Sequence, residues 1–89
     1  MSKPFDMRLF LSGVLNGSKT TQQRHLRQAR RMQAAIRLRW HRDTPWAWQL
    51  KHVHWFSTYY LKNHANLTQY RYRLTIILIC RRMRKNWCI

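Results

Sequence analysis

The charge balance restricts this chain more than any other feature of its sequence. Eighteen residues are Lys or Arg, only Asp6 and Asp43 are acidic, and the formal net charge is +16 at neutral pH. Repulsion among these charges destabilises the compact state, so we expect stability to rise with salt or with a bound anion.

Length and apolar content predict one small folded domain. A chain of 89 residues can form a single core that contributes about 3–5 kcal/mol. Its residues are 45% hydrophobic and include five Trp, four Tyr and three Phe, which is not the composition of a disordered chain. We therefore treat residues 1–89 as a single basic domain.

Nothing in the sequence predicts a membrane segment or secretion. The longest apolar run, at 76–80, is far shorter than the roughly 20 residues needed to cross a bilayer. The N-terminal stretch carries Asp6 and Arg8 and lacks a small-residue cleavage site. Cys80 and Cys88 are too few for a disulfide framework. We expect a cytoplasmic protein that does not act on a membrane.

Apolar residues recur at helical spacing along most of the chain, which predicts an all-α fold of three to four helices. Ser2 and Pro4 suit the start of a first helix. Thr20 with Gln23 and Asn66 with Gln69 have the form of capping boxes for two later ones. The predicted elements are one short N-terminal helix and three longer amphipathic helices, over 4–15, 21–42, 45–64 and 67–85.

The segment 70–80 is ambiguous between helix and strand. Residues 70–74 alternate with period two and residues 75–79 are rich in β-branched side chains, and both patterns are typical of a strand. A lone strand would find no partner elsewhere in this chain, whereas a helix can pack on the others. We therefore favour the helix.

The cations gather in two places. On the helix predicted over 21–42, arginines cluster opposite the apolar stripe, with Arg30 and Arg37 flanking that stripe. Guanidinium groups bind phosphate in a bidentate manner, and an ordinary solvated helix would intersperse Glu, which this chain lacks entirely. The predicted nucleic-acid-binding residues on this face and near the end of the last helix are Arg24, Arg27, Arg31, Arg39, Arg42, Arg81, Arg82, Arg84 and Lys85.

The helix predicted over 45–64 carries a second apolar stripe that needs its own explanation. A central helix can bury two faces, so core packing is one interpretation. Base stacking and a protein partner or homodimer interface are the others, because aromatic rings beside cations bind single-stranded nucleic acid and also form interface hot spots. The stripe and its neighbouring cations are Trp48, His52, Trp55, Tyr59, Lys51 and Lys62.

The sequence gives little support for catalysis or metal binding, and the one catalytic alternative is an acid–base ribonuclease that uses histidine and lysine alone. The two carboxylates, Asp6 and Asp43, fall on different predicted elements, and no glycine-rich phosphate loop is present. His52 and His54 are two residues apart and point to opposite sides of a helix. We expect neither an enzyme nor a cofactor or metal site.

These observations predict a nucleic-acid-binding protein. RNA is favoured over DNA because abundant arginine is combined with aromatic residues that can stack on bases. A different class of function is a small basic adapter or inhibitor, of a mobile-element type, that binds an acidic or nucleic-acid-binding surface of a larger protein machine. Sequence-tolerant binding of duplex DNA is the remaining alternative.

Overall fold

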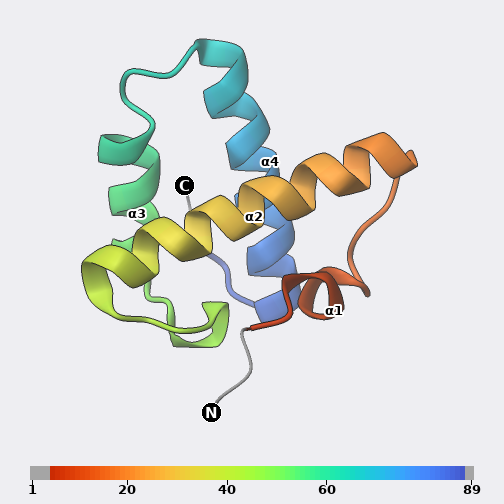
Figure 1. The fold of residues 1–89 in the computed structure, drawn as a ribbon, viewed down its shortest axis with the longest axis horizontal. Coiled ribbons are helices and arrows are strands. Elements are labelled where there is room, and N and C mark those ends of the chain that lie inside the picture. The colour runs from red at the N-terminus through yellow and green to blue at the C-terminus, as the bar shows by residue number, and fades with distance from the viewer. Residues whose placement is uncertain (1–4, 88–89) are drawn as a thin grey trace.

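Two long helices form the frame of the fold, and a short one closes one end of it. In the computed structural model, which describes residues 5–87, α2 (Lys19–Trp40) crosses over α4 (Asn66–Met83), and α1 (Met7–Leu11) packs against both (Figure 1). Every regular element between residues 5 and 87 is helical, which confirms the predicted all-α class. The strand alternative for 70–80 is wrong, because the whole segment lies inside α4.

α2 forms where the sequence pattern is most regular. Its interior contains Ala, Leu, Met, Gln and Arg, all strong helix formers, and no Gly or Pro. The helix begins two residues earlier than a Thr20 cap would allow, because Ser18 is the N-cap and its Oγ accepts the Thr21 N–H at 3.2 Å. Gly17 precedes it with a φ of 89°, a left-handed conformation that turns the chain into the helix.

The starts of α1 and α4 also differ from the predicted caps. Asp6 caps α1 through a 3.1 Å bond from the Leu9 N–H, while Ser2 and Pro4 lie outside the described residues. α4 begins after Ala65 with no side-chain cap. Gln69 instead turns back and donates its Nε2 to the backbone oxygen of Leu61 at 2.9 Å, which secures the preceding loop.

The segment predicted as one helix over 45–64 is divided into three short pieces. A 3₁₀ turn, η1 (Pro45–Ala47), is followed by α3 (Leu50–Trp55) and by a π-helical turn, η2 (Phe56–Tyr60). The break between η1 and α3 falls at Trp48 and Gln49, whose backbones are extended. It allows the Trp48 indole to enter the core, where only 3% of the residue is exposed.

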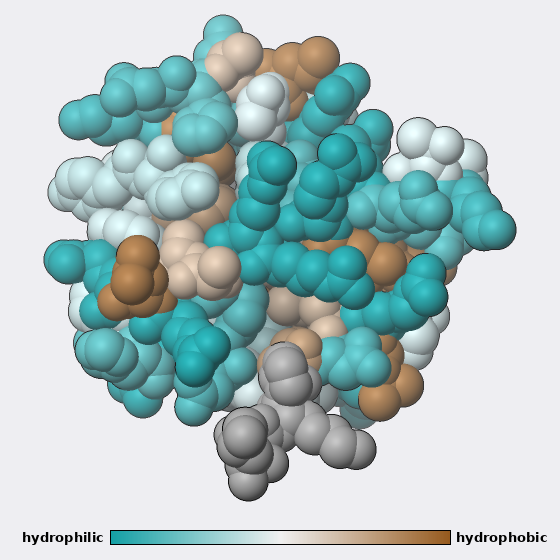
Figure 2. All heavy atoms as spheres, viewed as in Figure 1, coloured by the Kyte–Doolittle hydropathy of each residue, from teal (hydrophilic) through white to brown (hydrophobic). Residues whose placement is uncertain are grey.

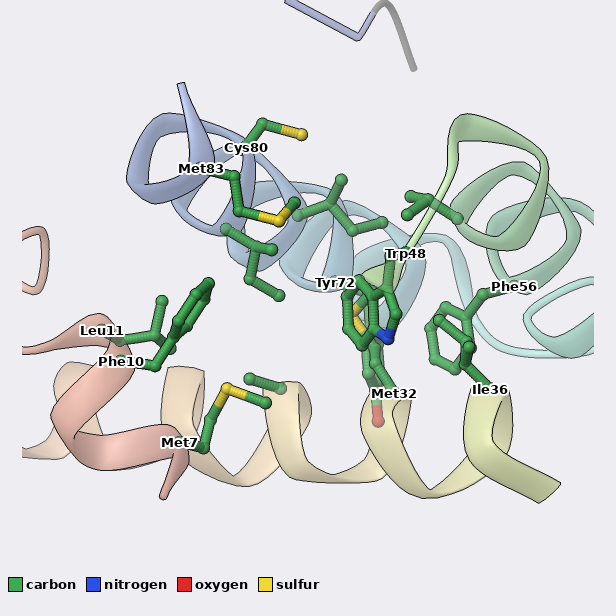
Figure 3. Packing of buried hydrophobic residues seen from close by; sticks show 14 of the residues in the cluster. Met7, Phe10, Leu11, Met32, Ile36, Trp48, Phe56, Tyr72, Cys80 and Met83 are labelled. Carbon is green, nitrogen blue, oxygen red and sulfur yellow. The ribbon is translucent and has the colours of Figure 1, made fainter. Parts of the chain in front are cut away.

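One hydrophobic core joins all these pieces. Figure 3 shows side chains from α1, α2 and α4 directed into a common interior together with Trp48 and Phe56. Packing of this kind, and not helix propensity alone, stabilises helices as short as α1 and α3. The buried members labelled in the figure are Met7, Phe10, Leu11, Met32, Ile36, Trp48, Phe56, Tyr72, Cys80 and Met83.

A buried hydrogen-bond network ties α2 to α4. The Thr75 hydroxyl donates to Gln28 Oε1 at 2.8 Å, and His25 Nδ1 lies 2.8 Å from the same hydroxyl oxygen. With its one proton given to Gln28, Thr75 can only accept from His25, so the Nδ1 of His25 carries a hydrogen. All three residues are buried, and each polar group therefore depends on the others.

Replacing Thr75 by valine should lower the stability of the protein. The substitution keeps the shape of the side chain but leaves buried polar atoms of His25 and Gln28 without a partner, which should cost about 1–3 kcal/mol of unfolding free energy. Urea unfolding followed by circular dichroism measures the loss. Thr58→Val, at an exposed site on η2, is the control and should change stability by less than about 0.5 kcal/mol. Equal effects of the two variants would exclude a structural role for the network.

Candidate nucleic-acid interface

Arginine side chains project from the outward side of α2. Arg27, Arg30 and Arg31 are all exposed, and their spacing of three and four residues places them on one side of the helix. We call these residues the α2 arginine face. Figure 2, drawn from the same direction as Figure 1, shows hydrophilic side chains gathered over the middle of the surface that α2 crosses. Arg27 and Arg31 belong to the predicted site, and the structure adds Arg30 to them.

The α2 arginine face has no carboxylate to neutralise it within residues 5–87. The ion pair found in that range joins Arg37 Nε to Asp43 Oδ1 at 3.3 Å, at the far end of the helix. Both of its side chains are exposed, so this pair contributes little to stability. The positive potential of the face is therefore left for solvent ions or for a ligand.

The other predicted arginines of this region lie at its edges. Arg24 is half-buried, and Arg39 is exposed with its guanidinium carbon 5.0 Å from the ring centre of Trp40 and 5.6 Å from that of Trp55. Arg42 is half-buried and lies beyond the helix, because α2 ends at Trp40. The structure therefore does not place Arg42 on the helical face that its sequence spacing predicts.

The second predicted cluster, at the end of α4, divides into one structural arginine and three exposed cations. Arg82 Nε donates to the backbone oxygen of Phe10 at 2.7 Å, and its guanidinium carbon lies 5.0 Å from the ring centre of Trp46. This half-buried side chain joins α4 to α1 and η1. The members of the cluster that remain exposed are Arg81, Arg84 and Lys85.

The aromatic stripe predicted on the third helix does not form one surface. Trp48 and His52 are buried in the core, so neither presents a free ring face to a base. Trp55 is half-buried, and Tyr59, which is 65% exposed, is the member that reaches solvent. The break at Trp48 and the π-helical turn change the direction in which successive side chains point. The residues predicted to share one face of a continuous helix therefore do not lie on one face.

Lys51 and Lys62, the cations predicted to lie beside that stripe, are both exposed. Lys51 Nζ lies 5.4 Å from the ring centre of Trp40, and Trp40 also faces Arg39. Two cations over one indole are an arrangement that the ring quadrupole stabilises. Lys51 therefore extends the basic surface from the end of α2 onto α3.

His52 is held in one tautomer by its surroundings. Its Nδ1 accepts the backbone N–H of Gln49 at 2.9 Å, so the ring proton is on Nε2, and its ring centre lies 4.8 Å from that of Trp40. Burial lowers the pKa of His52 from its ordinary value, and the nearby charges of Arg42 and Lys51 lower it further. Burial, followed by Arg24, likewise lowers the pKa of His25.

Stability should consequently fall in mild acid. Because the folded protein holds His25 and His52 with lowered pKa values, the unfolded chain binds more protons below about pH 6.5, and the unfolding free energy drops by up to about 1.4 kcal/mol per pH unit for each histidine. Above that pH the contribution is fully present. Urea unfolding at several pH values between 5 and 7.5 measures the slope, which His52→Gln should reduce. A stability that stays flat or rises on acidification would contradict the assignment of neutral, buried histidines.

Two other kinds of site find no support in the described part of the chain. Between residues 5 and 87, no His, Cys, Asp and Glu side chains come together in a group of three or more that could hold a metal ion. None of the helices described is long and apolar enough to span a membrane.

Comparisons of the sequence with protein-family models and with curated proteins, and of the structure with solved structures, give no match.

Proposed function

We propose that the protein binds RNA and that the α2 arginine face contacts its phosphates. The observation that carries the proposal is the set of three exposed arginines on one side of α2, none of which has a carboxylate partner among residues 5–87. Cations placed in this way bind a polyanion mainly by releasing its condensed counterions. The proposed role is binding alone and involves no chemical step.

RNA is favoured over duplex DNA because exposed tyrosine rings occur together with exposed arginines. Tyr59 and Tyr70 are both more than half exposed, and Tyr70 is followed in α4 by Arg71 and Arg73, which are also exposed. Unpaired bases stack on such rings while the cations hold the backbone, and RNA offers unpaired bases in its loops and ends. Duplex DNA exposes no base face for this contact.

A second candidate function follows from one apolar side chain among the arginines. Leu38 is 84% exposed and lies seven residues after Arg31, on the same side of α2. Phosphate contacts do not account for it, whereas an acidic protein surface with an apolar pocket would use both the leucine and the arginines. In that case the protein would be a small basic adapter or inhibitor of a larger machine.

We place this binding in the cytoplasm. Cys80 is a free and buried thiol, and Cys88 lies outside the described residues. A single buried thiol needs no oxidising compartment.

Titration of labelled single-stranded RNA, duplex RNA and duplex DNA at several salt concentrations tests the proposal. We expect RNA to bind more tightly than DNA, with a logarithm of the binding constant that falls linearly with the logarithm of the salt concentration. Absence of RNA binding at low salt would overturn the proposal. A protein partner that stays bound after nuclease treatment, combined with no RNA binding, would establish the adapter function instead.

A further inference from the structure

A basic groove lies along the C-terminal half of α4. It has a volume of about 620 Å³ and is formed by the outer side of that helix together with the residues that follow it. We call it the C-terminal groove. Its lining residues are Arg73, Ile77, Cys80, Arg81, Lys85, Asn86 and Trp87.

Part of the groove surface is apolar. Ile77, Cys80 and Trp87 contribute its apolar surface, and Trp87 is half-buried because part of it packs against the core. Burial raises the pKa of the Cys80 thiol, so this side chain is neutral and adds no charge of its own.

The three cations of the groove come from two helical turns and the segment beyond them. Arg73 and Arg81 are eight residues apart on α4, and Ile77 lies midway between them, so the three share one side of the helix. The backbone brings the third cation close: the Lys85 N–H bonds to the Cys80 oxygen at 2.9 Å, and Arg84 has a φ of 57°, so the chain turns back after the helix. Among the residues from 5 to 87, no carboxylate lines the groove.

We propose that the C-terminal groove binds a single unpaired nucleotide, with the base against Trp87 and Ile77 and the phosphate among Arg73, Arg81 and Lys85. The charge of the lining matches the anionic phosphate, and the apolar surface matches the flat face of a base. A volume of about 620 Å³ is within the usual range for small-molecule sites. The inference rests on the proposed function and extends it, since it names unpaired nucleotides as the part of the RNA recognised away from α2.

Titration with adenosine 5′-monophosphate, followed by NMR of the tryptophan indole N–H signals, tests the groove directly. The Trp87 signal, identified by its absence in Trp87→Phe, should shift in a saturable way, and inorganic phosphate at equal ionic strength should not reproduce the shift. Arg73→Gln should weaken the nucleotide about 2- to 5-fold, as expected for an exposed charge contact. Arg8→Gln is the matched control, because Arg8 is an exposed arginine, on α1, that does not line the groove. An unmoved Trp87 signal, or equal effects of the two arginine variants, would overturn the proposal.

Binding measurements with RNA oligonucleotides distinguish failure of the groove proposal from failure of the proposed function. Trp87→Ala should weaken single-stranded RNA by about 5- to 150-fold, the range for loss of one stacked base, and should leave duplex RNA of the same sequence nearly unaffected. Equal losses for both RNAs would contradict the groove while leaving RNA binding by α2 intact. A wild-type protein that binds the mononucleotide in the groove and no RNA would overturn the proposed function alone. Thermal melts of each variant show that it is folded.

Discussion

Replacing Arg27, Arg30 and Arg31 together by glutamine should weaken RNA binding by about 100- to 500-fold near 0.1 M salt. All three side chains are exposed and none is paired with a carboxylate between residues 5 and 87, so each is free to contact a phosphate. Each phosphate contact contributes about 0.7–0.9 to the slope of the logarithmic salt plot, and loss of three should lower that slope by about 2–3. Fluorescence anisotropy at several salt concentrations gives both numbers.

A matched charge change separates local contacts from bulk electrostatics. Arg8, Lys19 and Lys62 are exposed and lie on α1, at the start of α2 and on the loop before α4. Replacing these three by glutamine lowers the net charge by the same amount, yet it should leave most of the salt slope in place. Equal losses from both triple variants would show that net charge, and not the α2 arginine face, governs binding. Both variants should be at least as stable as the wild type, because each removes mutual repulsion.

Replacing Phe56 by alanine should have the largest effect on the fold. Phe56 is fully buried at the start of η2, and its ring centre lies 4.5 Å from that of Tyr60 and 5.4 Å from that of Tyr72. Loss of a buried phenylalanine costs about 3–5 kcal/mol, which is as much as the core of so small a domain contributes. We therefore expect no cooperative unfolding transition at 25 °C by circular dichroism.

Tyr59→Ala on the same π-helical turn is the control. Its side chain is 65% exposed, so its loss should change stability only slightly. If Phe56→Ala retained a cooperative transition close to that of Tyr59→Ala, the position of Phe56 in the core would be contradicted.

The π-helical turn explains why Phe56 and Leu61 can both be buried. Residues five apart in an α-helix are about 140° apart around its axis at 100° per residue, which would expose one of the two. The Leu61 N–H bonds to the Phe56 oxygen at 3.2 Å, so the wider turn brings both side chains toward the core. The spacing of apolar residues in the sequence does not predict this turn.

The sequence predicts those elements whose pattern is local. Leu26, Ala29 and Ile36 recur at helical spacing and are buried in α2, and 70–80 is helical, as expected for a segment with no strand partner. The break at Trp48 could not be predicted in the same way. It exists because burial of one large indole outweighs the continuity of a helix, and that depends on neighbours distant in sequence.

The candidate site was predictable to a similar extent. Arg27 and Arg31 are exposed on α2 as their spacing indicates, and Arg30 belongs beside them because its side chain reaches solvent and not the core edge. Arg82 could not be told apart from its neighbours, since its role depends on the backbone oxygen of Phe10, 72 positions away in the sequence. The C-terminal groove was also missed, because Trp87 meets Arg73 and Ile77 only in the folded chain.

NMR of the arginine side-chain Nε–H signals during an RNA titration tests most directly whether the α2 arginine face is the phosphate-binding surface. Signals of Arg27, Arg30 and Arg31 should shift at substoichiometric RNA, and that of Arg82 should stay in place because its Nε already donates to Phe10. RNA bound with unchanged signals from all three α2 residues would contradict the proposed interface.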